Sequence, residues 1–579
     1  MKTIIGIDLG TTHSLVAAFQ EGEPRLIRNA HGDFLTPSVV GVATDGRVLV
    51  GSAARELRVT RPENCVSQFK RWMGTDKQLE VAGRKFSAVE LSSLVLRSLK
   101  EDAEAHLGES VTEAVITVPA YFNDHQRKAT KQAGELAGLK VRRIINEPTA
   151  AALVYGFHER EAEKKLIVID LGGGTFDVTV MEVFLGTLEI VSTAGETQLG
   201  GEDFTARMVA EVLKDLGENL ELAEMKKPLL VSRLTQECER AKRALATNAS
   251  VEVRVPTDSG EFTEETRRVE FSRERLAKAV EPLLDRIRKP IVKALRDARL
   301  EPDSVEDIVL VGGSCRTVAV QELVRNLFGR PGEMKHDPDQ VVALGAAIQA
   351  ALIADDAAVE DIVVTDVCPF SLGVAIAKDF GDRIVPGYYL PIIHRNTTIP
   401  VSREEIVSTI NAGQREISVE VFQGESRRTE ENVPLGKLRV TDIPPGPAGQ
   451  EVVLRFTFDL NGILEVEAIV KATGARHAAV LTQNASSMTA TEIEDAVRRM
   501  QAIKFFPRDD LENQRLLAFA ERVVGEVAPY HRSALEEAID TFEASMQSGE
   551  REYFAAAKQN LEIVLSRLGF DSHDESRDV

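Results

Sequence analysis

Two segments about 160 residues apart share one pattern, an apolar strand that ends in aspartate and is followed by glycine and threonine. They are Ile4 to Thr12 (IIGIDLGTT) and Ile167 to Thr175 (IVIDLGGGT). Each continues into a second β-rich run, Ser14 to Phe19 in the first copy and Phe176 to Val183 in the second. This pattern predicts a strand, a tight turn and a returning strand. Because it occurs twice, we expect the chain to contain an internal duplication.

Strand and helix signals alternate through the rest of the first 359 residues. Ala114 to Pro119 predicts a strand, and the next predicted helix is capped by Asp124 and stopped by Gly138. Val141 to Ile145 predicts a strand that leads into another helix, which completes a βαβ unit. Ile308 to Val311 is a third apolar strand and ends in two glycines. We therefore expect a duplicated α/β body.

The 579 residues of the chain correspond to roughly four domains at about 150 residues per domain. After the α/β body, Val- and Ile-rich segments such as Glu416 to Gln423 and the hairpin signal at Asn461-Gly462 predict an antiparallel β domain. A capping-box pattern at Thr489 to Glu492 opens a series of amphipathic helices, with breaks near Pro507 and Pro529. The predicted parts are residues 1–359 (α/β body), 360–366 (linker), 367–485 (β domain), 486–570 (helices) and 571–579 (disordered tail).

Acidic residues outnumber basic residues, 91 against 70, and the formal net charge is −21. Such a surface would repel nucleic acid and anionic membranes, so we expect neither as a partner. No apolar stretch reaches the ~20 residues of a membrane span, and the N-terminus meets a charge after a few residues, unlike a signal peptide. The four cysteines show no CxxC spacing, which argues against a zinc site or a disulfide framework. We therefore expect a cytoplasmic protein.

The two duplicated turns have the composition of a phosphate site. Glycine lets the backbone turn sharply and exposes amide N–H groups, which can hold phosphate oxygens. The hydroxyls of Thr11, Thr12 and Thr175 stand beside these glycines, and Asp8 and Asp170 end the two strands. Carboxylates at such positions suit Mg2+ that is held mainly through its waters. One turn of this kind is most often only a turn, but two matched copies predict a nucleotide site.

Six motifs occur in order along the chain: IDLGTT from Ile7, VPAYFND from Val118, NEPTAAAL from Asn146, DLGGGTFD from Asp170, LGGEDF from Leu199 and VGGS from Val311. The set resembles the DnaK-type seventy-kilodalton heat-shock chaperones over nearly the whole chain, and the short helical end looks most similar to the HscC branch. The resemblance implies an actin-like duplicated α/β nucleotide-binding domain, an antiparallel β-sandwich peptide-binding domain and a short α-helical lid. It also implies ATP or ADP with Mg2+ as ligands, with K+ left open.

The resemblance assigns roles within the first half of the chain. Lys70 matches the lysine that positions the attacking water and screens γ-phosphate charge, in a reaction that needs mainly positioning and electrostatics. The implied catalytic residues are Asp8, Lys70, Glu147, Asp170, Thr175 and Asp177, and the implied Mg2+ residues, acting mostly through water, are Asp8, Glu147 and Asp170. The implied nucleotide-binding residues are Gly10, Thr11, Thr12, Gly172, Gly173, Gly174, Gly200, Gly201, Glu239, Lys242, Arg243, Gly312, Gly313, Ser314, Arg316 and Asp339. His13 and Ala246 stand where many relatives carry an aromatic residue and a serine.

The resemblance also assigns roles in peptide binding and in coupling. The implied peptide-binding residues are Leu372, Val374, Ile376, Ala377, Val407, Ile410, Ile417 and Val419, of which Ala377 and Ile410 would arch over the bound chain. From the residues alone, these alternating apolar positions fit an ordinary sandwich core equally well. The implied residues for interdomain and J-domain coupling are Pro119, Arg127, Arg143, Val363, Val364 and Asp366. Exposed apolar residues in a linker are costly unless they dock in one state, and Thr365 replaces one of them.

We therefore expect an ATP-dependent chaperone that binds and releases extended hydrophobic segments of unfolded clients during protein folding and the stress response. Its weak ATPase would switch peptide affinity, and a J-domain co-chaperone would assist a mainly monomeric protein. The need for an exchange factor is open, because the segments Gly74 to Ser87 and Thr257 to Thr266, which such factors grip, look short. Two alternatives remain: a specialised regulator of one native client, and a small-molecule kinase of the same fold.

Overall fold

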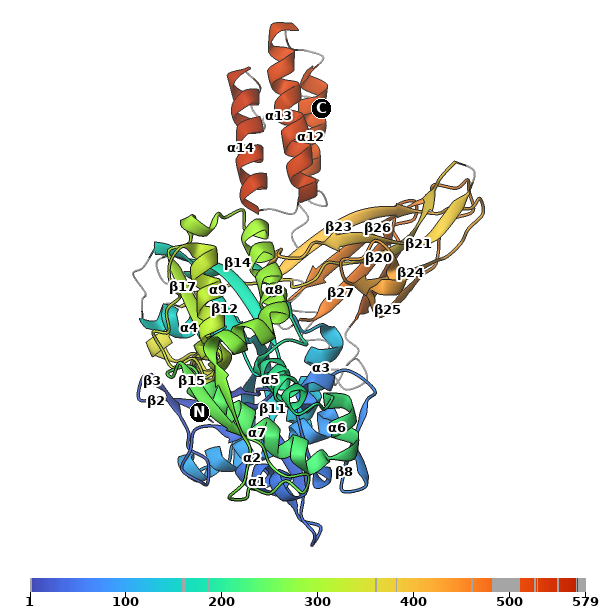
Figure 1. The fold of residues 1–579 in the computed structure, drawn as a ribbon. Helices are drawn as coiled ribbons and strands as arrows, with labels where there is room; N and C mark the ends of the chain where they lie inside the picture. The colour runs from blue at the N-terminus through green and yellow to red at the C-terminus, as the bar shows by residue number, and fades with distance from the viewer. Residues whose placement is uncertain are drawn as a thin grey trace. The chain divides into compact units, whose positions relative to one another are not determined.

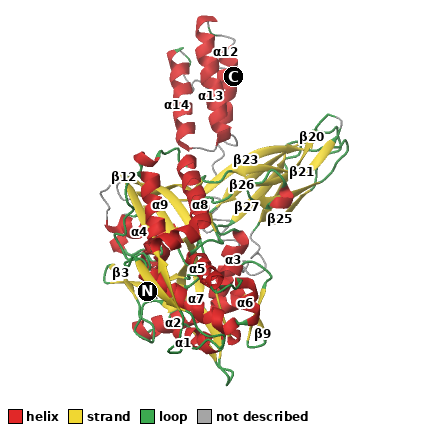
Figure 2. Cartoon of the chain, viewed as in Figure 1, coloured by secondary structure: helices red, strands yellow, loops and turns green. Residues whose placement is uncertain are grey.

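The computed structural model describes residues 3–158, 163–184, 187–359, 362–381, 383–459, 462–481, 511–524, 527, 529–548, 551–568 and 570. The chain divides into two compact units, Met1–Pro369 and Phe370–Val579. The first unit combines helices with mixed sheets, and the second contains a β domain followed by helices (Figures 1 and 2). Among the described residues, no helix combines the length and the apolar composition that a membrane span requires.

Two sheets with equivalent strand orders form the centre of the first unit. The first sheet has the order β11-β10-β1-β2-β3, with β4 on β2, and its strands are β1 (Ile4–Asp8), β2 (His13–Gln20), β3 (Glu23–Leu26), β4 (Thr36–Pro37), β10 (Glu113–Val118) and β11 (Lys140–Asn146). The second has the order β17-β12-β13-β14-β18, and its strands are β12 (Glu163–Leu171), β13 (Phe176–Phe184), β14 (Thr187–Glu196), β17 (Asp307–Val311) and β18 (Val363–Val364). β1 is antiparallel to β2 and parallel to β10, just as β12 is antiparallel to β13 and parallel to β17. The predicted duplication is confirmed.

Helices of the first unit cover these sheets. They are α1 (Ser52–Thr60), α2 (Ala88–Leu107), α3 (Asp124–Leu136), α4 (Glu147–His158), α5 (Gly201–Asp215), α6 (Leu220–Lys226), α7 (Pro228–Ala244), α8 (Arg273–Asp297), α9 (Val318–Phe328) and α10 (Val341–Ile353). α10 packs on β1 and β2, α4 packs on β12 to β14, and the two helices contact each other. α10 is rich in alanine and almost entirely buried, so its small side chains let it lie close to its neighbours. This pair of helices joins the two copies.

Short sheets lie outside the two central ones. Their strands are β5 (Val39–Val42), β6 (Val48–Val50), β7 (Cys65–Ser67), β8 (Gln78–Val81), β9 (Arg84–Ser87), β15 (Ser250–Arg254) and β16 (Arg268–Ser272). β5 pairs with β6 and β7, β8 pairs with β9, and β15 pairs with β16. They complete the outer parts of the two copies.

The prediction that Asp124 caps α3 is wrong by one residue. Asn123 has an extended backbone, and its side chain accepts a hydrogen bond from the amide of Gln126, whose own side chain accepts one from Asn123. Asn123 is preferred because its Oδ1 reaches this otherwise unpaired amide. Asp124 is the first helical residue and pairs with Lys128 instead. The helix ends at Leu136, and Gly138 follows with a φ of 78°.

The predicted linker adds a strand to the second sheet of the first unit. Val363 and Val364 form β18, which lies parallel to β14 with Thr187 opposite Val363. The amide of Thr365 donates to the carbonyl oxygen of Leu188 at 3.0 Å. Backbone hydrogen bonds to a sheet edge satisfy groups that would otherwise need water, so the linker is docked in this structure.

The second unit contains an antiparallel β-sandwich, as predicted. One sheet has the order β21-β20-β24-β25, with β20 (Leu372–Asp379), β21 (Ile384–Ile393), β24 (Ile417–Gln423) and β25 (Val433–Val440). The other has the order β23-β26-β27-β28, with β23 (Val401–Ser408), β26 (Glu451–Phe458), β27 (Leu464–Val470) and β28 (Arg476–Val480). β26 and β27 are antiparallel, as the hairpin signal predicts; Asn461 itself lies outside the described residues.

Three further helices belong to the second unit: α12 (Leu511–Val524), α13 (Pro529–Ser548) and α14 (Arg551–Arg567). They share a core that includes Leu516, Leu535, Phe542 and Leu561. The amphipathic pattern predicts such helices, and Pro529 begins α13 as proline at a helix start often does. The predicted capping box at residues 489–492, the break near residue 507 and the tail 571–579 lie outside the described residues.

Candidate functional site

The two duplicated turns interlock. A Cβ atom on Gly173 would lie 2.3 Å from Cγ2 of Thr12, and a Cβ on Gly174 would lie 2.5 Å from Cγ2 of Thr11. These distances are far below van der Waals contact, so only glycine allows the threonines of the first turn to lie on the backbone of the second. The turns at the ends of β1 and β12 therefore meet at one place, as the duplicated pattern predicts.

A third turn, after β17, joins the same place. Gly312 has a φ of 79°, and a Cβ there would lie 2.3 Å from the carbonyl oxygen of Leu171. Ser314 follows it and donates from Oγ to the carbonyl oxygen of Gly172 at 2.9 Å. A left-handed backbone that also touches a neighbouring carbonyl requires glycine. This contact ties the third turn to the second.

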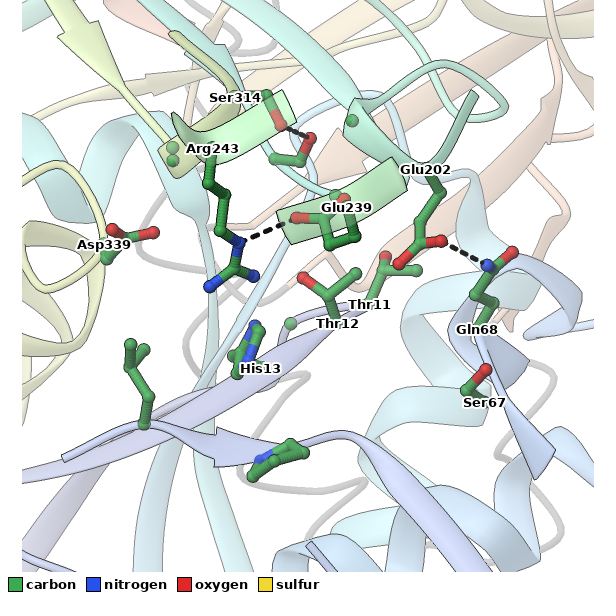
Figure 3. A pocket seen from close by; sticks show the side chains of 18 of the residues that line it. Thr11, Thr12, His13, Ser67, Gln68, Glu202, Glu239, Arg243, Ser314 and Asp339 are labelled. Carbon is green, nitrogen blue, oxygen red and sulfur yellow. Dashed lines mark hydrogen bonds and ion pairs between the residues drawn. The ribbon is translucent and has the colours of Figure 1, made fainter. Parts of the chain in front are cut away.

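The three turns line a cavity of about 730 Å³, within the range of small-ligand and cofactor sites. Figure 3 shows Thr11, Thr12 and Glu239 among its lining side chains. The predicted site residues that line it are Asp8, Gly10, Thr11, Thr12, Lys70, Glu147, Asp170, Gly172, Gly173, Thr175, Gly201, Glu239, Lys242, Arg243, Gly312, Gly313, Ser314, Arg316 and Asp339. The lining does not include the predicted residues Gly174, Gly200 and Asp177, although all three are close to lining residues in the chain.

Buried charges gather at the cavity and, in the case of Asp177, close to its lining residues in the chain. Lys70 is only 2% exposed, and its Nζ lies 2.6 Å from Oε1 of Glu147. Burial, followed by the charge of Glu147, raises the pKa of Asp8 to about 7. Burial and the charge of Glu147 also raise the pKa of Asp177 to about 8, and the pKa of Asp170 lies well above its ordinary value for the same reasons. One lysine thus faces four carboxyl groups.

This excess of carboxyl groups fits a hydrated cation. Among the described residues, no three His, Cys, Asp or Glu side chains are arranged to hold a metal ion directly. Asp8, Glu147 and Asp170 nevertheless line one cavity, and their mutual repulsion contributes to the raised pKa values. A divalent cation held through its waters would offset that repulsion. These three residues therefore fit the predicted Mg2+ position.

Paired cations also line the cavity. Glu239 accepts from Nε of Arg243 at 2.8 Å and lies 2.6 Å from Nζ of Lys242. Burial opposes the ionised form of Glu239, but the charge of Lys242 and the hydrogen bonds from Lys242, Thr205 and Arg243 together lower its pKa to about 2. Arg316 pairs with Asp339 at 2.8 Å. Ion pairing fixes two guanidinium groups, which can stack on a flat base.

His13 also lines the cavity, near Arg243. Figure 3 shows its ring and Arg243 facing each other. Burial, followed by the charges of Arg243 and Arg55, lowers the pKa of His13 to about 4. The imidazole is therefore neutral at physiological pH and does not repel a nearby guanidinium.

Sequence reasoning missed two contacts that join the halves of the duplication. Gln68 donates from Nε2 to Oε2 of Glu202 at 2.8 Å (Figure 3), and Arg71 pairs with Asp203 at 2.6 Å. The partners are more than 130 residues apart in the chain, and no local spacing marks them. Gln68 and Glu202 line the cavity, so their hydrogen bond joins its two sides.

A polar network connects β11 with the linker. Arg127 donates from Nη2 to Oδ1 of Asn146, and Asn146 donates from Nδ2 to Asp366 at 2.9 Å. Burial raises the pKa of Asp366, while Arg127 and then Arg143 oppose that shift. Arg127 also donates to the carbonyl oxygens of Ala120 and Phe122, beside the buried Pro119. The predicted coupling residues Arg127 and Asp366 are thus joined through Asn146, which the prediction omitted.

The predicted peptide-binding residues differ in burial. Leu372, Val374 and Val419 are fully buried in the sandwich, as the alternative of ordinary core predicts. The other five are half-buried or exposed: Ile376, Ala377, Val407, Ile417 and, at 47% exposure, Ile410. The side chains of β20 are thus more accessible toward its C-terminal end, and those of β24 toward its N-terminal end. A bound chain could contact the five accessible residues directly, whereas the three buried residues support the sandwich beneath them.

The comparisons with known proteins agree with this architecture. Residues 4–84 and 75–574 match the family described as Hsp70 protein. The chain is also similar to the chloroplastic stromal 70 kDa heat shock-related protein of Pisum sativum, with 41% identity over 546 residues, which cover 89% of this chain and 75% of that protein. The match spans both units, including the three turns and the β-sandwich. The chain therefore belongs to the Hsp70 family, whose members are chaperones and ATPases that typically bind ATP or ADP with Mg2+.

Proposed function

We propose that this protein is an ATP-dependent molecular chaperone of an HscC-like branch. It binds extended hydrophobic segments of unfolded clients, and slow ATP hydrolysis switches its affinity for them. A J-domain co-chaperone assists it through Arg143 and Asp366. We also propose a cytoplasmic, mainly monomeric protein; its four cysteines are buried and form no disulfide bond, as suits a reducing compartment.

The observation that carries this proposal is a sheet that runs from the cavity to the linker. The turn between β12 and β13 lines the cavity, β14 pairs with β13, and β18 of the linker pairs with β14. A change of ligand at the turn can therefore alter the sheet edge on which the linker docks. Two sites that bias one such element are coupled, and the coupling acts in both directions.

The chain's own side chains suit slow hydrolysis. Lys70 places a buried ammonium group beside Glu147, where it can orient a water and screen phosphate charge. Thr11, Thr12 and Thr175 offer hydroxyl donors to phosphate oxygens. A bound Mg2+ would supply charge neutralisation, with Asp8, Glu147 and Asp170 holding its waters. Because the cavity residues mainly position and neutralise, they fit phosphoryl transfer to water.

The two alternatives, a small-molecule kinase and a regulator of one native client, are tested by different observations. A small-molecule kinase needs an acceptor, and the β-sandwich has no role in that chemistry, so membership of the Hsp70 family favours the chaperone. A regulator of one native client would use the same machinery. Identification of the proteins captured by the ATP-depleted protein separates a regulator from a general chaperone.

The release of a fluorescent apolar peptide tests the proposal. We expect ATP to accelerate release from the wild-type protein, and Val363→Asp with Val364→Asp to abolish the acceleration, because two charges prevent β18 from docking. Both ligands should still bind. The matched control is Leu222→Asp with Met225→Asp, two exposed apolar residues of α6. Wild-type acceleration in the linker variant would refute coupling through β18, and a wild-type protein that binds no peptide would refute the chaperone proposal.

A further inference from the structure

The hairpin formed by β20 and β21 extends past its neighbour in the sheet. β20 pairs with β24 over Leu372 to Val374, whereas its pairing with β21 continues to Asp379, opposite Ile384. Figure 1 shows the two long strands side by side in the β domain. Past Val374, β20 therefore pairs only with β21 among the described residues, while Arg428 forms a bridge to Tyr388 on the other side of β21.

Three cations surround one aromatic ring of this hairpin. Nζ of Lys378 lies 5.2 Å from the ring centre of Tyr388, and the guanidinium carbons of Arg427 and Arg428 lie at 5.3 and 4.0 Å. Arg427 and Arg428 come from the loop between β24 and β25. Tyr388 is only 7% exposed, so the cations cover it. Cation–π contacts hold the charges in place without neutralising them.

These charges have no acidic partner within the described part of the chain. On the same sheet, by contrast, Lys437 pairs with Glu420 and Arg439 pairs with Glu416. A local cluster of unpaired cations is unusual in a chain of net charge −21. It creates a positive site that attracts carboxylates.

Apolar side chains lie beside the cations. Phe380 is 51% exposed and Ile384 is 47% exposed, and the ring centre of Phe380 lies 5.9 Å from that of Tyr388. We define the hairpin patch as Lys378, Phe380, Ile384, Tyr388, Arg427 and Arg428. Its composition suits a polypeptide that presents carboxylates next to an apolar side chain.

The hairpin patch adjoins the proposed peptide-binding residues. Ile376 is one of them and lies directly opposite Tyr388 across the two strands, and Lys378 follows two residues later. We propose that the patch binds acidic residues that flank the apolar segment of a client, so that this protein selects apolar segments with an acidic flank. This inference rests on the proposed function and names its substrate class.

The test compares peptides that share one apolar core and differ only in flanks that are neutral, acidic or basic. Fluorescence anisotropy with the full chain and ADP measures their affinities. We expect the acidic-flanked peptide to bind about tenfold more tightly than the neutral one, and the difference to shrink at high salt. Arg427→Glu with Arg428→Glu should remove this preference and favour the basic flank, while changing the affinity of the neutral peptide less than about twofold.

The control variant is Lys437→Glu with Arg439→Glu, which reverses two paired cations of the same sheet and should leave the preference unchanged. Equal affinities for all flanks in the wild type would overturn the inference and leave the chaperone proposal intact. Failure to bind any peptide would overturn both. An equal effect of charge reversal on all peptides would also overturn the inference, because it would indicate that the patch docks an acidic surface of this chain.

Discussion

At the scale of single residues, Lys70 shows how a charge is made useful by burial. Its ammonium group is withdrawn from water and paired with Glu147, so its field acts in a region of low polarity. A lysine on the surface would be screened by solvent. Because Lys70 is paired with Glu147 and lines the cavity, its ammonium group has a defined position there.

We predict that Lys70→Ala leaves ATP binding largely intact but lowers turnover at least about a hundredfold, because a positioned charge that acts on the transition state contributes ~3 kcal/mol or more. Single-turnover hydrolysis and a separate nucleotide titration measure the two effects. Lys85→Ala, which removes an exposed lysine of β9, is the control. Near-wild-type turnover in a folded Lys70 variant would remove this residue from the mechanism.

His13 predicts a pH dependence of stability. Its pKa is about 4 in the folded protein and about 6.5 in an unfolded chain, so the unfolded state binds the proton first as pH falls. The stability that depends on neutral His13 is complete above pH ~6.5 and is lost progressively toward pH ~4. We expect the free energy of unfolding of His13→Gln to match that of the wild type at pH ~7.5 and to exceed it by about 1 kcal/mol at pH ~5. The difference is no larger because solvent partly screens the half-buried ring.

Thermal unfolding without nucleotide, measured at both pH values, provides this comparison. His31→Gln, which changes an exposed histidine, should show no such divergence. A difference between His13→Gln and the wild type that is the same at both pH values would contradict the pKa argument.

At the scale of elements, the residue that follows the linker strand β18 has an unsatisfied polar group. The hydroxyl oxygen of Thr365 is buried and has no hydrogen-bond partner among the described residues. A buried hydroxyl of this kind costs ~1–3 kcal/mol. The docked strand is therefore weaker than an all-apolar linker would be, which keeps docking reversible.

We predict that Thr365→Val stabilises the docked strand by about 1 kcal/mol, since valine has the same shape and needs no partner. The amide of residue 365 donates to Leu188, and its hydrogen exchange should slow about fivefold. Thr365→Ser keeps the hydroxyl and should give no such protection. Unchanged exchange in the valine variant would show that the hydroxyl does not weaken docking.

At the scale of the whole molecule, the terminal helices form a unit with its own core. Leu535, Phe542, Leu561 and Leu565 are buried within α12 to α14. Such a bundle buries most of its apolar surface between its own helices. We therefore expect weak closure over the peptide site.

We predict fast peptide release even with ADP bound, and a change of only a few-fold when residues Leu511 to Val579 are deleted, because differences among related complexes lie mostly in dissociation rates. Phe542→Asp, which disrupts the bundle core in the full-length chain, should act like the deletion. Stopped-flow release of a labelled peptide measures both. If the helices slow release more than about tenfold, the weak-lid prediction is wrong.

The sequence alone determined the elements and the chemistry of the duplicated turns. Apolar residues ending in Asp and glycine predict β1 and β12, and the glycines and threonines predict a phosphate site, because a strand's period and a turn's backbone are local properties. The resemblance to the family then supplied Lys70 and Glu147, which the local pattern would leave as surface charges. Glu147 lies within the NEPTAAAL motif, whereas Lys70 is assigned only by the resemblance to the family.

Only the tertiary structure decided which distant residues meet. Asn146 joins Asp366 across 220 residues and Gln68 joins Glu202 across 134, and no local spacing encodes such pairs. The structure likewise separates Val374, which is core, from Ile376, which is partly accessible, although both belong to one alternating strand. Burial depends on what packs above a position, and hydrogen-bond partners depend on which strands become neighbours. Both are properties of the assembled fold.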